Sequence, residues 1–130
     1  MSTVVSVAAA VALGGALGSL LRHGANHAAA RWVGLGFPWG TFIVNVVGCF
    51  LMGIAAAVFA QRTGLAPEWR ALLATGFLGG FTTFSAFSLD FAQLLAHGYV
   101  GRAALYLGAT VILAIVGFYL GAGAAKFVLS

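Results

Sequence analysis

Polar side chains recur at helical spacing inside segments that are otherwise apolar, and together they could bind an ion. Thr41 and Asn45 are four residues apart, and so are Tyr106 and Thr110, so that each pair shares one face of a helix. The amide of Asn45 offers two N–H donors, and each hydroxyl adds one more. A stripe of donors of this kind suits a small anion.

Each of these residues also has an ordinary structural interpretation. Asn45 could instead form a hydrogen bond between two helices, worth about 0.6–2 kcal/mol in a membrane. Tyr106 could belong to the aromatic belt at a membrane boundary, and Thr110 could bond to its own helix backbone. The spacing alone leaves both interpretations open for each residue.

The most unusual stretch of the chain is Gly79 to Ser88, with the sequence GGFTTFSAFS. Two successive glycines and two successive threonines, with spaced phenylalanines, are not typical of a lipid-facing helix. Irregular backbone at membrane depth is tolerated only where it is buried in protein or lines a polar cavity. Broken helices near the midplane recur in ion and substrate sites. We therefore expect a helix break near residues 79–83 and a functional site beside it.

Three further residues near this stretch could take part in ion binding. Phe84 and Phe87 are three apart on one face, either as core packing or with their positive ring edges toward an anion. Asp90 follows at the same spacing, and a carboxylate this deep is a functional candidate as a proton relay, a cation ligand or a partner for arginine. Arg22 could either reach the membrane surface or attract anions into a vestibule.

The sequence argues against an enzyme. No second acid lies near Asp90 for paired-carboxylate chemistry, and the sequence offers no plausible Ser/His/Asp set and no glycine-rich phosphate loop after a strand. His23 and His27 are four apart, but no carboxylate or cysteine lies near them to complete a metal site. The cations are spread along short loops, as membrane anchors are, so we expect no nucleic-acid partner.

The composition identifies an all-α membrane protein. Of 130 residues, 62% are hydrophobic and 6% are charged, whereas a soluble domain has about 25% charged residues. Four stretches lack charges and are long enough to span a bilayer, which takes about 20 helical residues. We predict a single four-helix transmembrane domain over residues 1–130, with helices at about 4–22, 38–61, 69–96 and 103–126 and a polar connection over 23–36.

The cations are balanced across the predicted membrane. Four crossings place Arg62, Arg70 and Lys126 on one side and Arg22, Arg31 and Arg102 on the other. Orientation follows the Lys/Arg bias, and equal numbers predict insertion in both orientations. Two chains of opposite orientation can form an antiparallel homodimer, an inverted repeat of the kind that transport proteins use.

Pairs of glycines at GxxxG spacing would pack helices within a subunit or between subunits. They are Gly14 and Gly18, Gly76 and Gly80, and Gly117 and Gly121.

Taken in order, these motifs resemble the small bacterial fluoride channels of the Fluc, or CrcB, family. The resemblance covers nearly the whole chain. It rests on the run Gly14 to Gly18 leading to Arg22, on Gly40-Thr41 followed by Asn45 and Gly48, and on the string GFLGGFTTFS that begins at Gly76. The last of these is the most specific of the three.

The resemblance implies a passive fluoride-selective channel in the bacterial inner membrane that exports fluoride from the cytoplasm. It implies an antiparallel, dual-topology homodimer that holds a central Na⁺ on backbone carbonyls at the break, here those of Gly79 and Thr82. It also implies that two fluoride pathways are lined by equivalents of Asn45, Phe84, Phe87, Thr41, Ser85, Tyr106 and Thr110.

The chain departs from the family pattern at three positions. The family commonly has threonine at the position of Ala86, glutamate at that of Asp90 and a hydroxyl at that of Ala114. The polar track on the fourth helix is therefore shorter here, and the role of Asp90 is left open.

Two other functions compete with the channel. A small proton-coupled exporter of cationic drugs can also be a four-helix dual-topology dimer, but it needs a buried carboxylate in the first helix, where this chain has none. A structural subunit without transport activity gives no reason for the glycine-threonine stretch.

Overall fold

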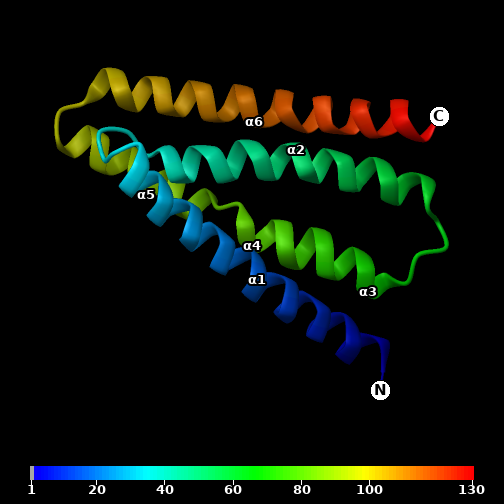
Figure 1. The fold of residues 1–130 in the computed structure, drawn as a ribbon. Helices are drawn as coiled ribbons and strands as arrows, with labels where there is room; N and C mark the ends of the chain where they lie inside the picture. Colours follow the sequence, from blue (N-terminus) through cyan, green and yellow to red (C-terminus); the bar gives the residue numbers. More distant parts are fainter. Residues whose placement is uncertain (1) are drawn as a thin grey trace.

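The computed structural model describes residues 2–130, which form four long helical segments (Figure 1). Each segment is long and apolar enough to cross a membrane, as the composition predicts. Three segments are single helices, and the third, residues 67–96, is built from four shorter elements. The bounds are α1 Thr3–Trp32, α2 Trp39–Gln61, α3 Pro67–Arg70, η1 Ala71–Leu78, α4 Gly79–Phe81, α5 Phe84–Ala96 and α6 Val100–Leu129.

Helix α1 continues well past the end predicted for it. The sequence suggested an end near Arg22, followed by a polar connection, but the helix runs on to Trp32. The alanines at 28–30 favour helix, and polar residues beyond the hydrocarbon core do not interrupt one. The helix ends where Gly34 adopts a positive φ of 111° and its N–H bonds to the carbonyl of Ala29, a helix end that suits glycine.

The third segment changes its backbone geometry along its length. Residues Ala71–Leu78 form a π-helix, a rare form that is frequently found at functional sites. After α4 the backbone is extended at Thr82, with φ −86° and ψ 157°, and at Thr83, with φ −155° and ψ 125°. A second helix, α5, then begins at Phe84, where the hydroxyl of Thr83 accepts from the N–H of Ala86.

Helix α1 packs against η1 and α4 with only glycine between the backbones. A Cβ atom at Gly18 would collide with the carbonyl of Phe77, and one at Gly76 would lie 2.8 Å from the carbonyl of Val11. Small residues at such crossings let membrane helices approach closely. The GxxxG pairs of α1 and of the third segment therefore pack against each other inside one chain.

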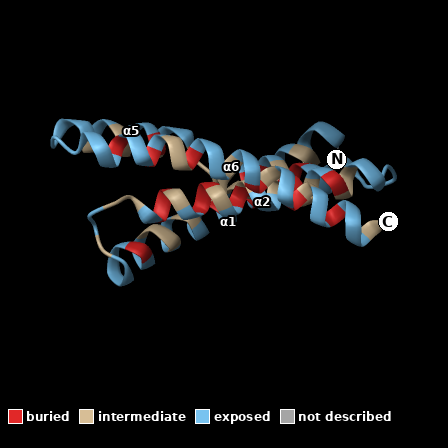
Figure 2. Cartoon of the chain, turned by 90° about the horizontal axis from the view of Figure 1, so that it is seen from above, coloured by how far each residue is buried: buried red, intermediate tan, exposed pale blue. Residues whose placement is uncertain are grey.

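Glycines also allow close contact between α2 and α6, which lie side by side along their lengths (Figure 1). A Cβ at Gly121 would collide with the carbonyl of Phe50, and one at Gly53 with that of Phe118. The buried residues follow these inner faces, while most of each helix is exposed (Figure 2).

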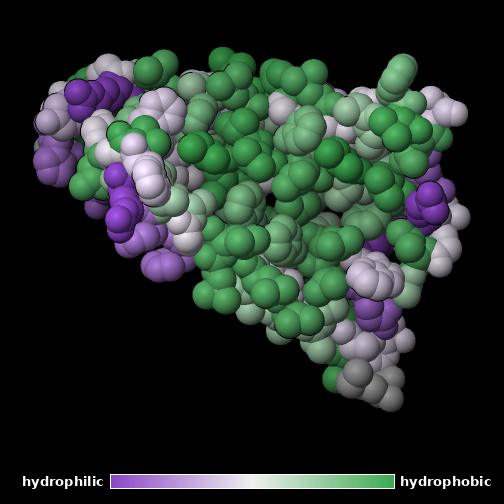
Figure 3. Space-filling model, viewed as in Figure 1, coloured by the Kyte–Doolittle hydropathy of each residue, from purple (hydrophilic) through white to green (hydrophobic). Residues whose placement is uncertain are grey.

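The exposed surface is divided as a membrane protein requires. An apolar band covers the middle of the molecule, and hydrophilic residues gather at its two ends (Figure 3). Both termini and the turn between α2 and α3 lie at one end, and the other two connections lie at the opposite end (Figure 1). The chain is a multi-pass membrane protein.

Gly121→Ala tests the close contact between α2 and α6. We expect a loss of about 1–3 kcal/mol of stability, because the new methyl group must push the two backbones apart. Thermal unfolding of the purified protein in detergent measures this loss. Gly123→Ala is the matched control, since a Cβ at Gly123 meets nothing within 4 Å. Equal unfolding temperatures for the two variants would contradict the packing described above.

Candidate ion pathway

Asn45 makes two hydrogen bonds to a single residue of the third segment. Its Oδ1 accepts from the N–H of Thr83 at 2.7 Å, and its Nδ2 donates to the carbonyl of Thr83 at 3.0 Å. Asn45 is buried, with 8% of its surface exposed. A buried amide therefore satisfies both backbone groups of a residue that lies outside any helix.

This bonding changes the partners of the backbone carbonyls just before α5. In an α-helix the N–H of Thr83 would bond to the carbonyl of Gly79, and that of Ala86 to the carbonyl of Thr82. Here Thr83 donates to Asn45, and Ala86 donates to the Thr83 hydroxyl. The two carbonyls that the resemblance assigns to Na⁺ thus lose the donors that a continuous helix would give them. Carbonyl oxygens without helical partners are suitable ligands for a hard cation.

Arg22 reaches the same stretch from the opposite side. Its Nε donates to the carbonyl of Gly80 at 2.9 Å. The side chain is half-buried rather than extended into solvent. Side chains from α1 and α2 therefore hold the backbone within α4 and just after it, Arg22 at Gly80 and Asn45 at Thr83.

The two candidate phenylalanines differ sharply in their surroundings. Phe87 is 5% exposed, whereas Phe84 is 78% exposed, although their ring centroids are only 5.6 Å apart. Ser85 is also exposed, and its hydroxyl lies 3.3 Å from that of Thr83. One ring is part of the subunit core and the other faces outward.

The polar residues of α2 and α6 meet inside the bundle. Thr41, Tyr106 and Thr110 are all buried, with 5%, 0% and 6% of their surfaces exposed. The Tyr106 hydroxyl donates to the carboxylate of Asp90 at 3.0 Å, and the Tyr106 ring lies 5.0 Å from that of Phe87. The Thr110 hydroxyl is buried without a hydrogen-bond partner among residues 2–130.

A cavity leads from the connection between α1 and α2 toward these groups. Its volume is about 230 Å³, and Thr41 and Asp90 are among its lining residues. Solvent could reach the half-buried Asp90 carboxylate and the Thr41 hydroxyl by this route. The structure thus brings together Asn45, Thr41, Phe87, Tyr106 and Asp90, and it places Phe84 and Ser85 on the outside.

Sequence reasoning missed the role of Thr83. It enters the site through its backbone N–H and carbonyl, and no property of a threonine side chain reveals that. The partnership of Tyr106 with Asp90 was also not foreseen, although both residues stood out separately as polar groups in apolar segments.

Residues 9–122 match the profile of the family described as CrcB-like protein, Camphor Resistance (CrcB). The chain belongs to the CrcB-like family. Its curated relatives in this family align over most of their own lengths.

Three of these relatives illustrate the similarity. A protein of Nitrobacter hamburgensis named fluoride-specific ion channel FluC 2 is 50% identical over 111 residues, which cover 85% of this chain and 90% of the relative. A fluoride-specific ion channel FluC of Rhizobium etli is 54% identical over 78% of this chain and 81% of its own length. A fluoride-specific ion channel FluC of Hyphomonas neptunium is 49% identical over 85% of this chain and 88% of its own length.

Asn45→Leu tests the double hydrogen bond to Thr83. We expect a loss of about 1–3 kcal/mol, because the substitution leaves a buried N–H and a buried carbonyl without partners. Denaturant or thermal unfolding in detergent measures the change. Thr110→Val is the control, since the hydroxyl that it removes has no partner in the described chain. If both variants were as stable as the parent protein, the contribution of the double bond would be refuted.

Proposed function

We propose that this chain is a passive, fluoride-selective channel that exports fluoride from the bacterial cytoplasm across the inner membrane. The observation that carries the proposal is the identity of about half of the aligned residues with relatives that are named fluoride-specific ion channels. The buried polar residues between α2, α5 and α6 support it. They offer donors rather than the nucleophile and base of an enzyme.

Fluoride is small and strongly hydrated, so a pathway must replace its water with other donors. The amide of Asn45 uses one hydrogen on the carbonyl of Thr83 and keeps a second for an ion. The Thr110 hydroxyl has no hydrogen-bond partner to give up within residues 2–130. Phe87 excludes bulk water, and its ring edge carries partial positive charge. Thr41, Tyr106 and Ser85 supply further hydroxyls along the proposed route.

We further propose that the working unit is an antiparallel homodimer in which the interruption at residues 82–83 is functional. The equal numbers of cations that the sequence predicts on the two sides support insertion in both orientations. The exposure of Phe84 supports a partner, because a second chain would cover the part of the ring that the subunit leaves open. In such a dimer, Arg22 would line the entrance vestibule while its Nε holds Gly80.

The same interruption is the proposed site of a central Na⁺. The carbonyls of Gly79 and Thr82 would hold the ion. They are suited to it because the N–H groups that would bond to them in a continuous helix donate to other acceptors. When bound, the ion supplies a fixed positive charge that joins the two subunits. Asn45 and Thr83 would keep the two carbonyls in position.

Flux from liposomes tests the function directly. Purified protein reconstituted into vesicles is expected to dissipate a fluoride gradient and to leave a chloride gradient intact, as ion-specific electrodes can record. Equal loss of chloride, or no loss of either ion, would contradict the proposal.

Thr110→Val separates conduction from stability. We expect the variant to be at least as stable as the parent protein, because it removes a buried hydroxyl that is unpaired within residues 2–130. We expect it to conduct fluoride about tenfold more slowly, for the loss of one hydrogen bond of about 1.4 kcal/mol to the ion. The initial rate of fluoride efflux at matched protein density measures the effect. An unchanged rate would exclude Thr110 from the pathway.

A further inference from the structure

Two cavities meet at Arg102, near the turn that joins α5 to α6. One has a volume of about 420 Å³ and a partly polar lining. The other has a volume of about 410 Å³, and Arg102 is the only charged residue of its lining. Arg102 and Phe37 border both cavities, so that a polar space adjoins an apolar one.

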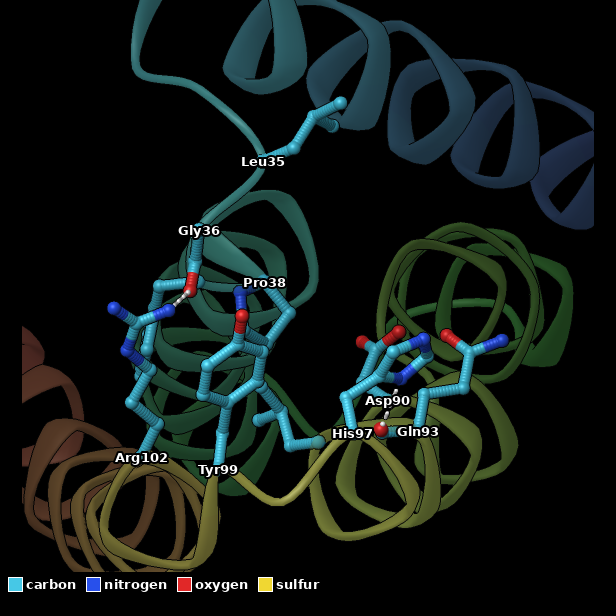
Figure 4. A pocket seen from close by; sticks show the side chains of 10 residues that line it. Leu35, Gly36, Pro38, Asp90, Gln93, His97, Tyr99 and Arg102 are labelled. Atoms are coloured by element: carbon cyan, nitrogen blue, oxygen red, sulfur yellow. Dashed lines mark hydrogen bonds between the residues drawn. The ribbon is translucent and has the colours of Figure 1, made fainter.

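The polar cavity has groups of opposite charge on its two walls (Figure 4). Asp90, Gln93 and His97 come from α5 and its end, and Arg102 faces them from the start of α6. The Oδ2 of Asp90 accepts from Tyr106, which leaves the other carboxylate oxygen for a cationic group. The space can therefore accept a ligand with both a negative and a positive charge.

The apolar cavity runs into the membrane from the same point. It is lined by Trp39 and Phe42 of α2 and by Leu105 and Ala109 of α6. Both helices begin at this end of the molecule, so the groove extends from Arg102 toward the bilayer centre over roughly 10 Å, at 1.5 Å per residue. This is the direction that a lipid acyl chain takes.

Arg102 is held in place at the junction. Its Nη1 donates to the carbonyl of Gly36 at 3.1 Å, and its guanidinium lies 4.6 Å from the ring centre of Tyr99. Only one of its five N–H donors is used in this way. Trp39 and Tyr99 are aromatic residues of the kind that mark the headgroup level of a bilayer, so the remaining donors lie where lipid phosphates lie.

We propose that these two cavities form one binding site for a phospholipid with an amine headgroup. The phosphate binds Arg102, the ammonium group lies in the polar cavity toward Asp90, and the start of one acyl chain fills the apolar groove. Basic pockets between membrane helices are known to bind phosphate-bearing lipid headgroups, and here Asp90 adds a partner for the ammonium group. Arg102 and the apolar groove lie outside the proposed fluoride route, whereas Asp90 also bonds to Tyr106 of that route.

Native mass spectrometry of the purified protein tests the site with added phosphatidylethanolamine. We expect Arg102→Gln to weaken retention of this lipid about tenfold, for the loss of one charge-assisted contact. Ala109→Phe, which fills the groove without changing charge, should have a similar effect. Arg31→Gln is the matched control, because Arg31 lies at the same end of the molecule and lines neither cavity. Phosphatidylglycerol, which lacks the ammonium group, should be retained less than phosphatidylethanolamine.

Three results would overturn the proposal. Equal retention by Arg102→Gln and Arg31→Gln would remove Arg102 from the site, and equal retention of the two lipids would exclude the amine headgroup. If Ala109→Phe abolished self-association while Arg102→Gln still held the lipid, the groove would be covered by a second copy of the chain. The unfolding temperatures of all the variants show whether a loss of lipid retention comes from misfolding.

Discussion

The double hydrogen bond between Asn45 and the backbone of Thr83 is the interaction on which the rest of the site depends. A bilayer offers no water to satisfy an N–H or a carbonyl, so a helix can be interrupted there only if protein groups take over. Asn45 supplies an acceptor and a donor from one planar amide, which matches the two groups that one extended residue exposes. A side chain of α2 thus supplies the partners for the backbone N–H and carbonyl of Thr83.

Close packing by glycine makes the other side of this arrangement possible. Because glycines let α1 approach η1 and α4 at backbone distance, the Arg22 side chain can reach the carbonyl of Gly80. A bulkier residue at Gly18 would separate the two backbones and remove Arg22 from that carbonyl. The close packing of the backbones and the hydrogen bond from Arg22 are therefore coupled.

The sequence predicts which residues are unusual better than it predicts their partners. Charge-free runs indicate four membrane-spanning helices, since length and composition alone decide that question. The end of α1 was misplaced because polar side chains do not end a helix once it has left the hydrocarbon. Spacing placed Phe84 and Phe87 on one face, yet one is exposed and the other buried, because burial depends on which helices lie opposite. The π-helix has no sequence pattern that could have predicted it.

The buried hydroxyl of Thr110 and the exposed ring of Phe84 are opposite departures from a well-packed subunit. A buried hydroxyl without a partner costs about 1–3 kcal/mol, and valine would fill the same volume without that cost. Phe84 has 78% of its surface uncovered directly after the extended residues Thr82 and Thr83. Both are explained if the subunit is incomplete: an ion provides the partner that the hydroxyl lacks, and a second chain covers the ring. The costs then belong to the isolated subunit, and assembly and ion binding remove them together.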